Sequence, residues 1–181
     1  MRHSEDVTEQ QAYDVLRDYP GFELRWYPAH MVAETRVKGS FEGVGNRAFM
    51  RLVGYISGRN GAAQKVAMTA PVVQEAEEPE TDGYVVGFVM PADFDAERAP
   101  EPNDPEVRLR TIPAQTAAAL RFSGRWTRAR YEEHAERLLA ALESAGLEVD
   151  GPLRFARFDP PWTPWFLRHN EVVAPVVPPA G

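Results

Sequence analysis

The chain has 181 residues, 44% hydrophobic and 26% charged, which suits one globular domain with a sizeable core. The formal net charge of −7 argues against a nucleic-acid partner, because phosphate binding requires a basic surface. The absence of cysteine excludes disulfides, thiolate metal ligands and a cysteine nucleophile. The sequence has no apolar run long enough to cross a bilayer and no signal-peptide pattern, so we expect a cytosolic protein without a membrane span.

The first part of the chain reads as a mobile tail over residues 1–11, followed by three strands. Residues 13–16 and 22–27 are joined by a turn at Tyr19-Pro20-Gly21, and residues 31–38 form the next strand. In residues 22–27, apolar and polar side chains alternate. One face of this strand should therefore point into the core.

A helix is expected to begin at Ser40, a favourable N-cap, and to end near Ser57 and Gly58. Its first apolar stripe consists of Phe41, Val44, Ala48, Leu52 and Tyr55. A second, adjoining stripe consists of Phe49, Met50, Val53 and Ile56. A surface helix normally carries one stripe, so this helix either lies deep in the core or lines a ligand site.

Two further strands and two loops follow this helix. The strands are expected at residues 66–73 and 84–90, with an acidic loop at 74–83 between them. A long loop rich in proline and acidic residues covers 91–105, either as a lid or as a linker.

The second half of the chain repeats the first. Residues 28–39 align with residues 113–124 at a constant offset, and the proline, both alanines, an arginine and the glycine coincide. A second helix is expected at 128–145, followed by strands near 153–158 and 171–177. The repeat predicts an α+β fold of two β-α-β-β halves related by a pseudo-two-fold axis, with a ligand cleft at the seam between them.

The titratable residues give few candidates for catalysis or metal binding. His30 and His169 are weak candidates for an iron ligand, and His134 lies at the edge of the second helix's apolar stripe, but no spacing is typical of a metal site. Glu171 opens an apolar strand, where burial would raise its pKa and suit it to acid–base chemistry. The alternative is an ion pair with Arg168 or another arginine.

Residues 158–166 (FDPPWTPWF) combine four aromatic side chains with three prolines. Aromatic rings on a stiff loop offer flat apolar surface at a low entropic cost, which suits stacking on a planar ligand. The alternative is that this segment plugs one end of the fold.

Several motifs together resemble those of a bacterial member of the SOUL haem-binding protein family, in order, from residue 13 to residue 174. These motifs are Tyr19-Pro20-Gly21-Phe22-Glu23-Leu24-Arg25-Trp26-Tyr27, Gly45-Asn46-Arg47-Ala48-Phe49, Tyr55-Ile56-Ser57-Gly58, Lys65-Val66-Ala67-Met68-Thr69-Ala70-Pro71-Val72, Met90-Pro91, Phe122-Ser123-Gly124, Phe158-Asp159-Pro160-Pro161 and Arg168-His169-Asn170-Glu171-Val172. The resemblance implies a distorted antiparallel β-barrel flanked by two helices, formed by residues 12–177 between tails at 1–11 and 178–181.

The resemblance also implies a ligand and its site. The ligand would be haem or another porphyrin, held without a fixed axial ligand in an apolar groove along the first helix. Carried over by position, the groove would consist of Asn46, Phe49, Met50, Val53, Phe158 and Trp162. Arg47, Arg51 or Arg168 would pair with the propionates. This chain differs from some relatives in carrying Asn46, Gly54 and Thr163 where they have basic residues, and His169 where arginine is commoner.

Three functions follow as hypotheses. The first is a non-catalytic carrier or buffer of haem or another tetrapyrrole, bound by burial of the flat macrocycle. The second is a hydrolase related to the effector-binding domains of bacterial multidrug-responsive regulators, with Glu171 or another acidic residue of the cleft activating water on a small apolar substrate. The third is a module that sequesters drugs or has a regulatory role.

Overall fold

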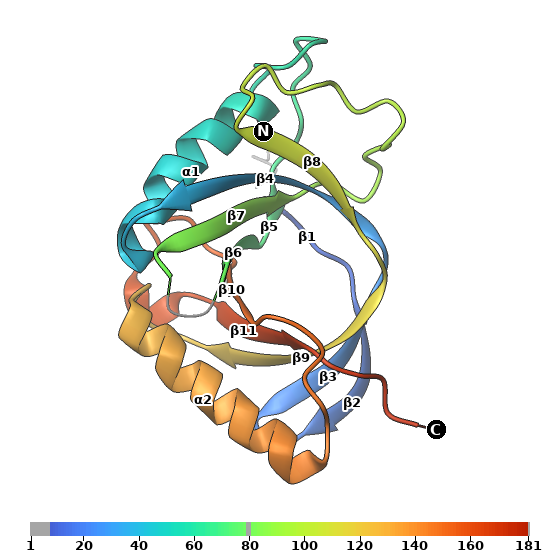
Figure 1. Cartoon of the computed structure of the whole chain (residues 1–181), viewed down its shortest axis with the longest axis vertical. Helices are drawn as coiled ribbons and strands as arrows, with labels where there is room; N and C mark the ends of the chain where they lie inside the picture. Colours follow the sequence, from blue (N-terminus) through green and yellow to red (C-terminus); the bar gives the residue numbers. More distant parts are fainter. Residues whose placement is uncertain (1–7, 79–80, 181) are drawn as a thin grey trace, which may run out of the picture.

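The computed structural model describes residues 8–78 and 81–180, and its central feature is one nine-stranded antiparallel sheet. From edge to edge the strands are β2 (Asp14–Tyr19), β3 (Phe22–Tyr27), β9 (Gln115–Phe122), β11 (Asn170–Pro175), β10 (Arg154–Arg157), β6 (Val72–Ala76), β7 (Gly83–Val89), β4 (His30–Lys38) and β8 (Val107–Ile112). The sheet curves strongly, so that β4, β7 and β8 lie opposite β9 and β3 (Figure 1).

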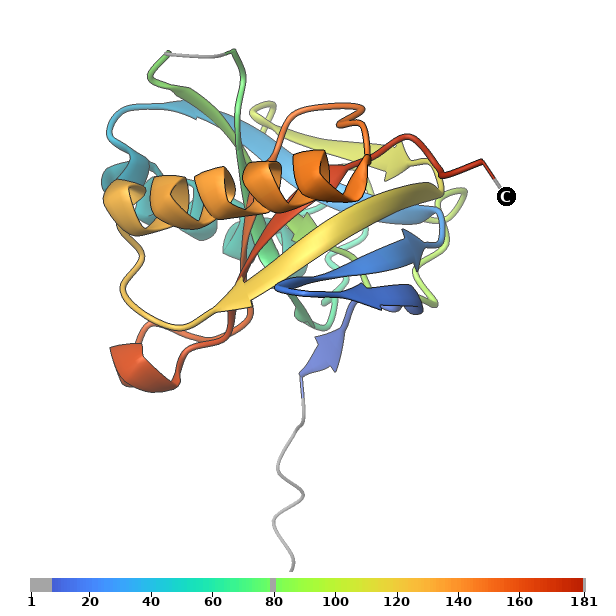
Figure 2. The same cartoon turned by 90° about the horizontal axis from the view of Figure 1, so that it is seen from below.

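Two helices, α1 (Phe41–Ile56) and α2 (Arg128–Ala145), cover the convex face of the sheet (Figures 1 and 2). Ser40 caps α1 by accepting a hydrogen bond from the backbone N–H of Gly43, and Thr127 caps α2 in the same way. Gly146, with φ at 69°, ends α2 in the left-handed conformation that favours glycine. The short 3-10 helix η1 (Trp165–Leu167) projects at the margin of the molecule (Figure 2). None of the helices in the described ranges is long and apolar enough to span a membrane.

The main core lies between the helices and the sheet. Phe155 on β10 is 1% exposed, and its ring centroid lies 5.6 Å from that of Phe41 on α1 and 5.4 Å from that of Tyr131 on α2. The first predicted stripe of α1 is wholly buried, which confirms its inward orientation. Ile56 of the second stripe is also buried, whereas Met50 is 67% exposed. The second stripe is therefore only partly buried, and the helix does not lie wholly inside the core.

Strand alternation gives the sheet two different faces. On β10, Phe155 and Arg157 point toward the helices, whereas Arg154 and Ala156 point into the concave side. The neighbouring strand β6 does the same, with Gln74 on the helix side and Glu75 on the concave side. The concave face carries most of the buried and half-buried charged groups of the sheet.

The α+β class, the two helices and the large antiparallel sheet agree with the sequence-based expectation, but the predicted barrel is wrong as a closed structure. The sheet is open: among the described residues, its edge strands β2 and β8 each pair with only one neighbour. The reason is that β2 and β8 do not pair with each other, and no further described strand lies between them to close the barrel. Strands β4 and β9, which contain the repeated sequence, each lie third from the junction between β6 and β10.

Three local expectations also differ from the structure. Strand β8 was not expected, because it directly follows the long proline-rich loop. The strand expected at 66–73 is instead the two-residue β5 (Thr69–Ala70) followed by β6, which extends into the expected acidic loop. Residues 1–7 of the expected N-terminal tail lie outside the described residues, whereas β1 (Glu9–Gln10) pairs in parallel with β5.

Removing the Phe155 side chain should destabilise the protein strongly. We expect Phe155→Ala to lower the free energy of unfolding by about 3–5 kcal/mol, because it leaves a cavity among the packed rings. Phe166→Ala is the matched control, since Phe166 is 59% exposed, and its change should stay below about 1 kcal/mol. Urea unfolding measures both; equal losses would contradict the placement of Phe155 at the centre of the core.

Candidate functional site

A cluster of two arginines and a tryptophan links α1 to the aromatic segment 158–167. The guanidinium carbon of Arg168 lies 4.1 Å from the ring centroid of Trp126, and that of Arg157 lies 5.2 Å from the same ring. Trp126 is fixed because its indole N–H donates to Oδ1 of Asn170 at 2.8 Å. We call these three residues, Arg157, Trp126 and Arg168, the arginine–tryptophan cluster.

Arg157 is a half-buried cation of this cluster. Its Nη2 donates to Oε1 of Gln74 at 2.6 Å, but its Nε is buried without a hydrogen-bond partner in the described part of the chain. Its guanidinium packs so closely on α1 that a Cβ at Gly45 would lie 2.9 Å from Nη1. Burial and the nearby charge of Arg168 lower the pKa of Arg157 to about 10. Arg157 therefore remains cationic at neutral pH in a site that solvates it poorly.

Arg168 holds the aromatic segment in place. Its Nε donates to the carbonyl of Thr163 at 3.0 Å, and its Nη2 donates to the carbonyl of Pro161 at 2.9 Å. Across residues 8–78 and 81–180, neither Arg168 nor Arg157 forms an ion pair with a carboxylate. The cluster thus carries two positive charges that this part of the protein does not pair.

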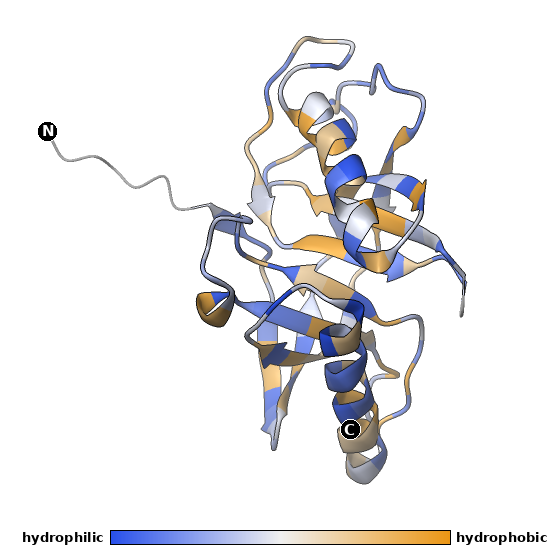
Figure 3. Cartoon of the chain, turned by 90° about the vertical axis from the view of Figure 1, so that its left-hand side faces the viewer, coloured by the Kyte–Doolittle hydropathy of each residue, from blue (hydrophilic) through white to orange (hydrophobic). Residues whose placement is uncertain are grey.

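The aromatic segment itself exposes much of its apolar surface. Trp162 is 84% exposed, and Trp165, Phe166 and Leu167 of η1 are each about half exposed or more. Figure 3 shows η1 as a largely hydrophobic turn on the flank of the face that the helices cover. A hollow of about 380 Å³ beside it is lined by Ser123, Gly124, Arg125, Thr127, Arg130, Trp165 and Phe166. Aromatic rings and two further arginines, Arg125 and Arg130, therefore line the same hollow.

The residues predicted for the haem groove are divided between the surface and the interior. Asn46, Met50 and Trp162 are exposed. Phe49 is half-buried and packs edge-on against Phe88, and Val53 also packs against the core. Phe158 is half-buried because its ring stacks on His169, with centroids 4.1 Å apart. Met50 and Trp162 are therefore the members of this set with the most apolar surface available to a ligand.

The other predicted propionate partners, Arg47 and Arg51, are tied to β4. Arg47 donates to the backbone carbonyl of Lys38, and Arg51 lies 3.4 Å from Oγ1 of Thr35. Of the three arginines named from the resemblance, only Arg168 belongs to the cluster. Arg157 and Trp126 were missed, because nothing in the sequence shows that β10 passes beside the start of α1.

Glu171 lies on the concave face in a buried ion pair. Its two carboxylate oxygens accept hydrogen bonds from Arg25 at 2.8 and 2.9 Å, and Oε1 lies 3.1 Å from Nε2 of His169. Burial acts to raise the pKa of Glu171, but the hydrogen bonds from His169 and Arg25 outweigh it and hold the pKa below its ordinary value. The partner is thus Arg25, on β3, and not Arg168.

The remaining histidines make internal contacts. Nδ1 of His30 lies 3.0 Å from the carbonyl of Pro28, and burial lowers the pKa of His30. His134 is 5% exposed, and its ring stacks on Phe122 with centroids 4.0 Å apart. Within the described ranges, histidine and carboxylate side chains do not gather into a set of three or more that would hold a metal ion. His30 and His169 remain candidates for an iron ligand only as single side chains.

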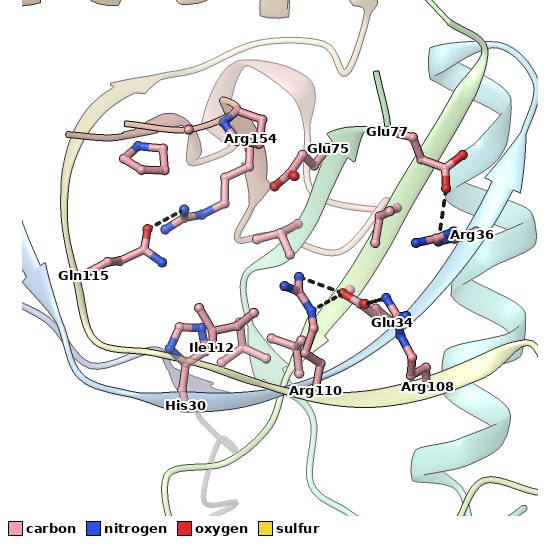
Figure 4. A pocket seen from close by; sticks show the side chains of 18 of the residues that line it. His30, Glu34, Arg36, Glu75, Glu77, Arg108, Arg110, Ile112, Gln115 and Arg154 are labelled. Carbon is pink, nitrogen blue, oxygen red and sulfur yellow. Dashed lines mark hydrogen bonds and ion pairs between the residues drawn. The ribbon is translucent and has the colours of Figure 1, made fainter. Parts of the chain in front are cut away.

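A large cavity occupies the hollow of the sheet, on the side opposite the helices. Its volume is about 1050 Å³, and its walls come mainly from β4, β6, β7 and β8, with Gln115 and Arg154 on the far side (Figure 4). On one wall, Arg108 and Arg110 both donate to the carboxylate of Glu34. The cavity lies at the junction of the two halves of the sheet, where the repeat in the sequence predicted a cleft.

The Arg25–Glu171 pair predicts a large effect of a small substitution. Glu171→Gln should lower the free energy of unfolding by about 3 kcal/mol, because it removes the buried carboxylate that binds two nitrogens of Arg25 and leaves only the partly exposed Glu23 as its ionic partner. The difference in stability between wild type and Glu171→Gln should shrink as the pH falls below about 4, the ordinary pKa of a glutamate. It should vanish once the pH lies below the lowered pKa of Glu171, where the carboxylate of the folded protein is protonated. Denaturant unfolding at several pH values measures both effects. Arg137→Met, which removes an exposed ion pair on α2, is the control and should stay within about 1 kcal/mol of wild type.

Comparisons with known proteins agree with this architecture. Residues 8–175 match the family model described as SOUL heme-binding protein. The chain is 26% identical over 166 residues to "Heme-binding protein 1" of Xenopus tropicalis, covering 85% of this chain and 87% of that protein.

Solved structures show the same fold at low sequence identity. The EcmrR C-terminal domain has a TM-score of 0.64 at 18% identity, over 91% of this chain and 98% of that one. A hydrolase from Listeria innocua has a TM-score of 0.61 at 12% identity, over 90% and 94% of the two chains. SAV2435 bound to tetraphenylphosphonium has a TM-score of 0.53 at 10% identity, over 86% and 97%. The family match extends over all but the ends of the chain, and the protein therefore belongs to the SOUL heme-binding protein family.

Proposed function

We propose that this protein binds haem or a related tetrapyrrole on its helix-covered side, at the arginine–tryptophan cluster between α1 and the aromatic segment, and acts as a carrier or buffer. Family membership supports haem as the ligand. The observation that carries the choice of site is the pair of guanidinium groups without carboxylate partners, Arg157 and Arg168, held on Trp126 beside exposed aromatic rings.

The residues of this site fit the chemistry of the group. A haem is a flat apolar ring with two carboxylates, so it needs apolar surface for the ring and cations for the propionates. Trp162 and Met50 provide exposed apolar surface, and Arg157 and Arg168 provide the cations. Neither Arg157 nor Arg168 has a carboxylate partner among the described residues, and the propionates of a bound haem would supply these counter-charges.

Binding alone accounts for this arrangement. Burial of the macrocycle supplies the driving force, and the ion pairs orient the ligand. This proposal does not require a protein side chain to coordinate the iron. His169, which follows Arg168 in the chain and stacks on Phe158, is the histidine best placed to do so.

The hydrolytic alternative receives less support from the geometry. It assigns water activation to Glu171, but both carboxylate oxygens of this residue accept hydrogen bonds from Arg25. A carboxylate whose pKa is held down by such a pair is a weak base. We therefore infer a structural role for Glu171.

We also infer that the two halves of the chain descend from one duplicated unit. The strand order β8-β4-β7-β6 continues as β10-β11-β9-β3, so the repeated sequence segments in β4 and β9 occupy corresponding positions about the seam. This supports the pseudo-two-fold relation that the repeated sequence predicted.

Titration with haem tests the proposed site. Arg157→Met should weaken haem binding by about 10- to 100-fold, because each charge-assisted hydrogen bond to a carboxylate contributes about 1.5–3 kcal/mol. Trp162→Ala should weaken binding by about tenfold through loss of apolar contact. The change in Soret absorbance gives the dissociation constants.

Arg98→Met provides the matched control, since Arg98 is exposed and lies on the loop after β7. Its haem affinity should equal that of wild type, and the melting temperature of each variant reports whether its fold is intact. Wild-type affinity in both Arg157→Met and Trp162→Ala would place the haem elsewhere.

A further inference from the structure

The cavity in the hollow of the sheet is separate from the proposed haem site. The sheet lies between them, because Arg157 points from β10 toward α1, whereas Arg154 points from the same strand into the cavity. At about 1050 Å³, the cavity is large enough for a small organic molecule. Its lining therefore indicates what a second ligand would be.

Part of the lining is apolar and comes from neighbouring strands. Val32 on β4, Val73 on β6, Val89 on β7 and Ile112 on β8 all contribute side chains to the wall. Figure 4 shows aliphatic side chains between the charged groups of the wall. These side chains form a surface suited to the apolar part of a ligand, because a small ionic ligand would leave them exposed to water.

One part of the cavity lining has more guanidinium groups than carboxylates. Arg108 and Arg110 share one carboxylate, that of Glu34. Arg154, on the facing strand, makes one hydrogen bond, from Nη1 to the neutral Oε1 of Gln115 at 3.3 Å. In the part of the chain that the structure describes, Arg154 has no carboxylate within ion-pair distance.

The acidic residue nearest to this excess is Glu75, on the strand next to Arg154. Figure 4 shows the two side chains near each other without an interaction drawn between them. Burial raises the pKa of Glu75 against the opposing effects of Arg154 and Arg110, and among the described residues no ion pair joins Glu75 to Arg154. The other acids of the wall, Glu77, Glu78, Asp82 and Asp150, lie at the end of β6 or in the connections between strands, and Glu77 pairs with Arg36. The whole lining has five lysine and arginine residues and six acidic ones, so the excess of positive charge is confined to the part around Arg108, Arg110 and Arg154.

We propose that this cavity is a second ligand site, which binds a small organic carboxylate through Arg154 and accommodates its apolar body on the valine and isoleucine side chains of β4, β6, β7 and β8. A guanidinium binds a carboxylate through two parallel N–H···O bonds, and Arg154 has donors to spare for them. Gln115 beside it can donate a further hydrogen bond from its amide nitrogen. A cationic ligand would instead meet the unpaired Arg154.

Calorimetric titration with three probes tests this proposal on the full chain. The probes are 2-naphthoate, its neutral analogue 2-naphthamide, and the lipophilic cation tetraphenylphosphonium. We expect 2-naphthoate to bind at least about tenfold more tightly than either of the others, because it alone carries the carboxylate. Equal affinity for acid and amide, preference for the cation, or absence of binding by all three would overturn the proposal.

Variants of Arg154 locate the binding. Arg154→Met should remove the preference for the acid over the amide, and Arg154→Lys should retain part of it, because lysine keeps the charge but not the planar fork. Arg137→Met, on the exposed face of α2, is the matched control and should behave as wild type. If Arg154→Met does not fold, Arg154→Lys and the wild-type comparison of acid and amide test the proposal instead. An unchanged preference for the acid in the folded Arg154 variants would contradict the proposal.

The same titration separates this proposal from the haem site. Trp162→Ala should leave 2-naphthoate binding unchanged, and saturation with haem should not displace the acid, because the two sites lie on opposite faces of the sheet. Displacement of 2-naphthoate by haem would show one shared site and would overturn the claim of a second one. Loss of haem binding in Arg157→Met has no bearing on this result.

Discussion

The antiparallel pairing of β10 with β6 is the contact on which the rest of the structure depends. It alone joins the strands β8, β4, β7 and β6 to the strands β10, β11, β9, β3 and β2 within the nine-stranded sheet of residues 8–78 and 81–180. Because side chains alternate along a strand, this register sends Phe155 and Arg157 to the helices and Arg154 to the hollow. A shift by one residue would exchange these faces and abolish both the aromatic core and the two cationic sites.

The two faces of the seam share one electrostatic feature. Each holds an arginine that forms no ion pair within the described chain: Arg157 against α1 and Arg154 in the cavity. Burying a cation without a counter-charge is unfavourable, and burial lowers the pKa of both residues. Elsewhere the fold does pair its buried charges, as Arg25 and Glu171 show. The contrast is the physical reason to assign anionic ligands to the seam and a structural role to the Arg25–Glu171 pair.

Periodicity in the sequence was enough to predict both helices and most strands. The five residues of the first α1 stripe are buried, and α2 begins at Arg128 and ends at Ala145, which are the expected bounds. The strand β8 was missed although Val107 and Leu109 alternate with arginines, because a long loop rich in proline precedes it. The open edges of the sheet were also not predictable, since pairing between distant strands leaves no local pattern.

The candidate sites were harder to predict than the fold. The aromatic segment was recognised from composition alone, yet its rings divide between the surface, as for Trp162, and internal stacking, as for Phe158. Arg154 and Arg157 look alike in the sequence, three residues apart in a short strand. Alternation along the strand already places them on opposite faces, but only the three-dimensional structure shows what surrounds each of them.

The location of bound haem is the most direct test of this account. In an isotope-labelled sample, the paramagnetic iron of ferric haem broadens amide resonances of nearby residues. We predict the strongest broadening in α1 and in residues 158–168, with weaker broadening of the resonances of β4, β7 and β8 that line the hollow. Broadening centred on the strands of the hollow, with α1 and the aromatic segment unaffected, would contradict the assignment of haem to the helix side.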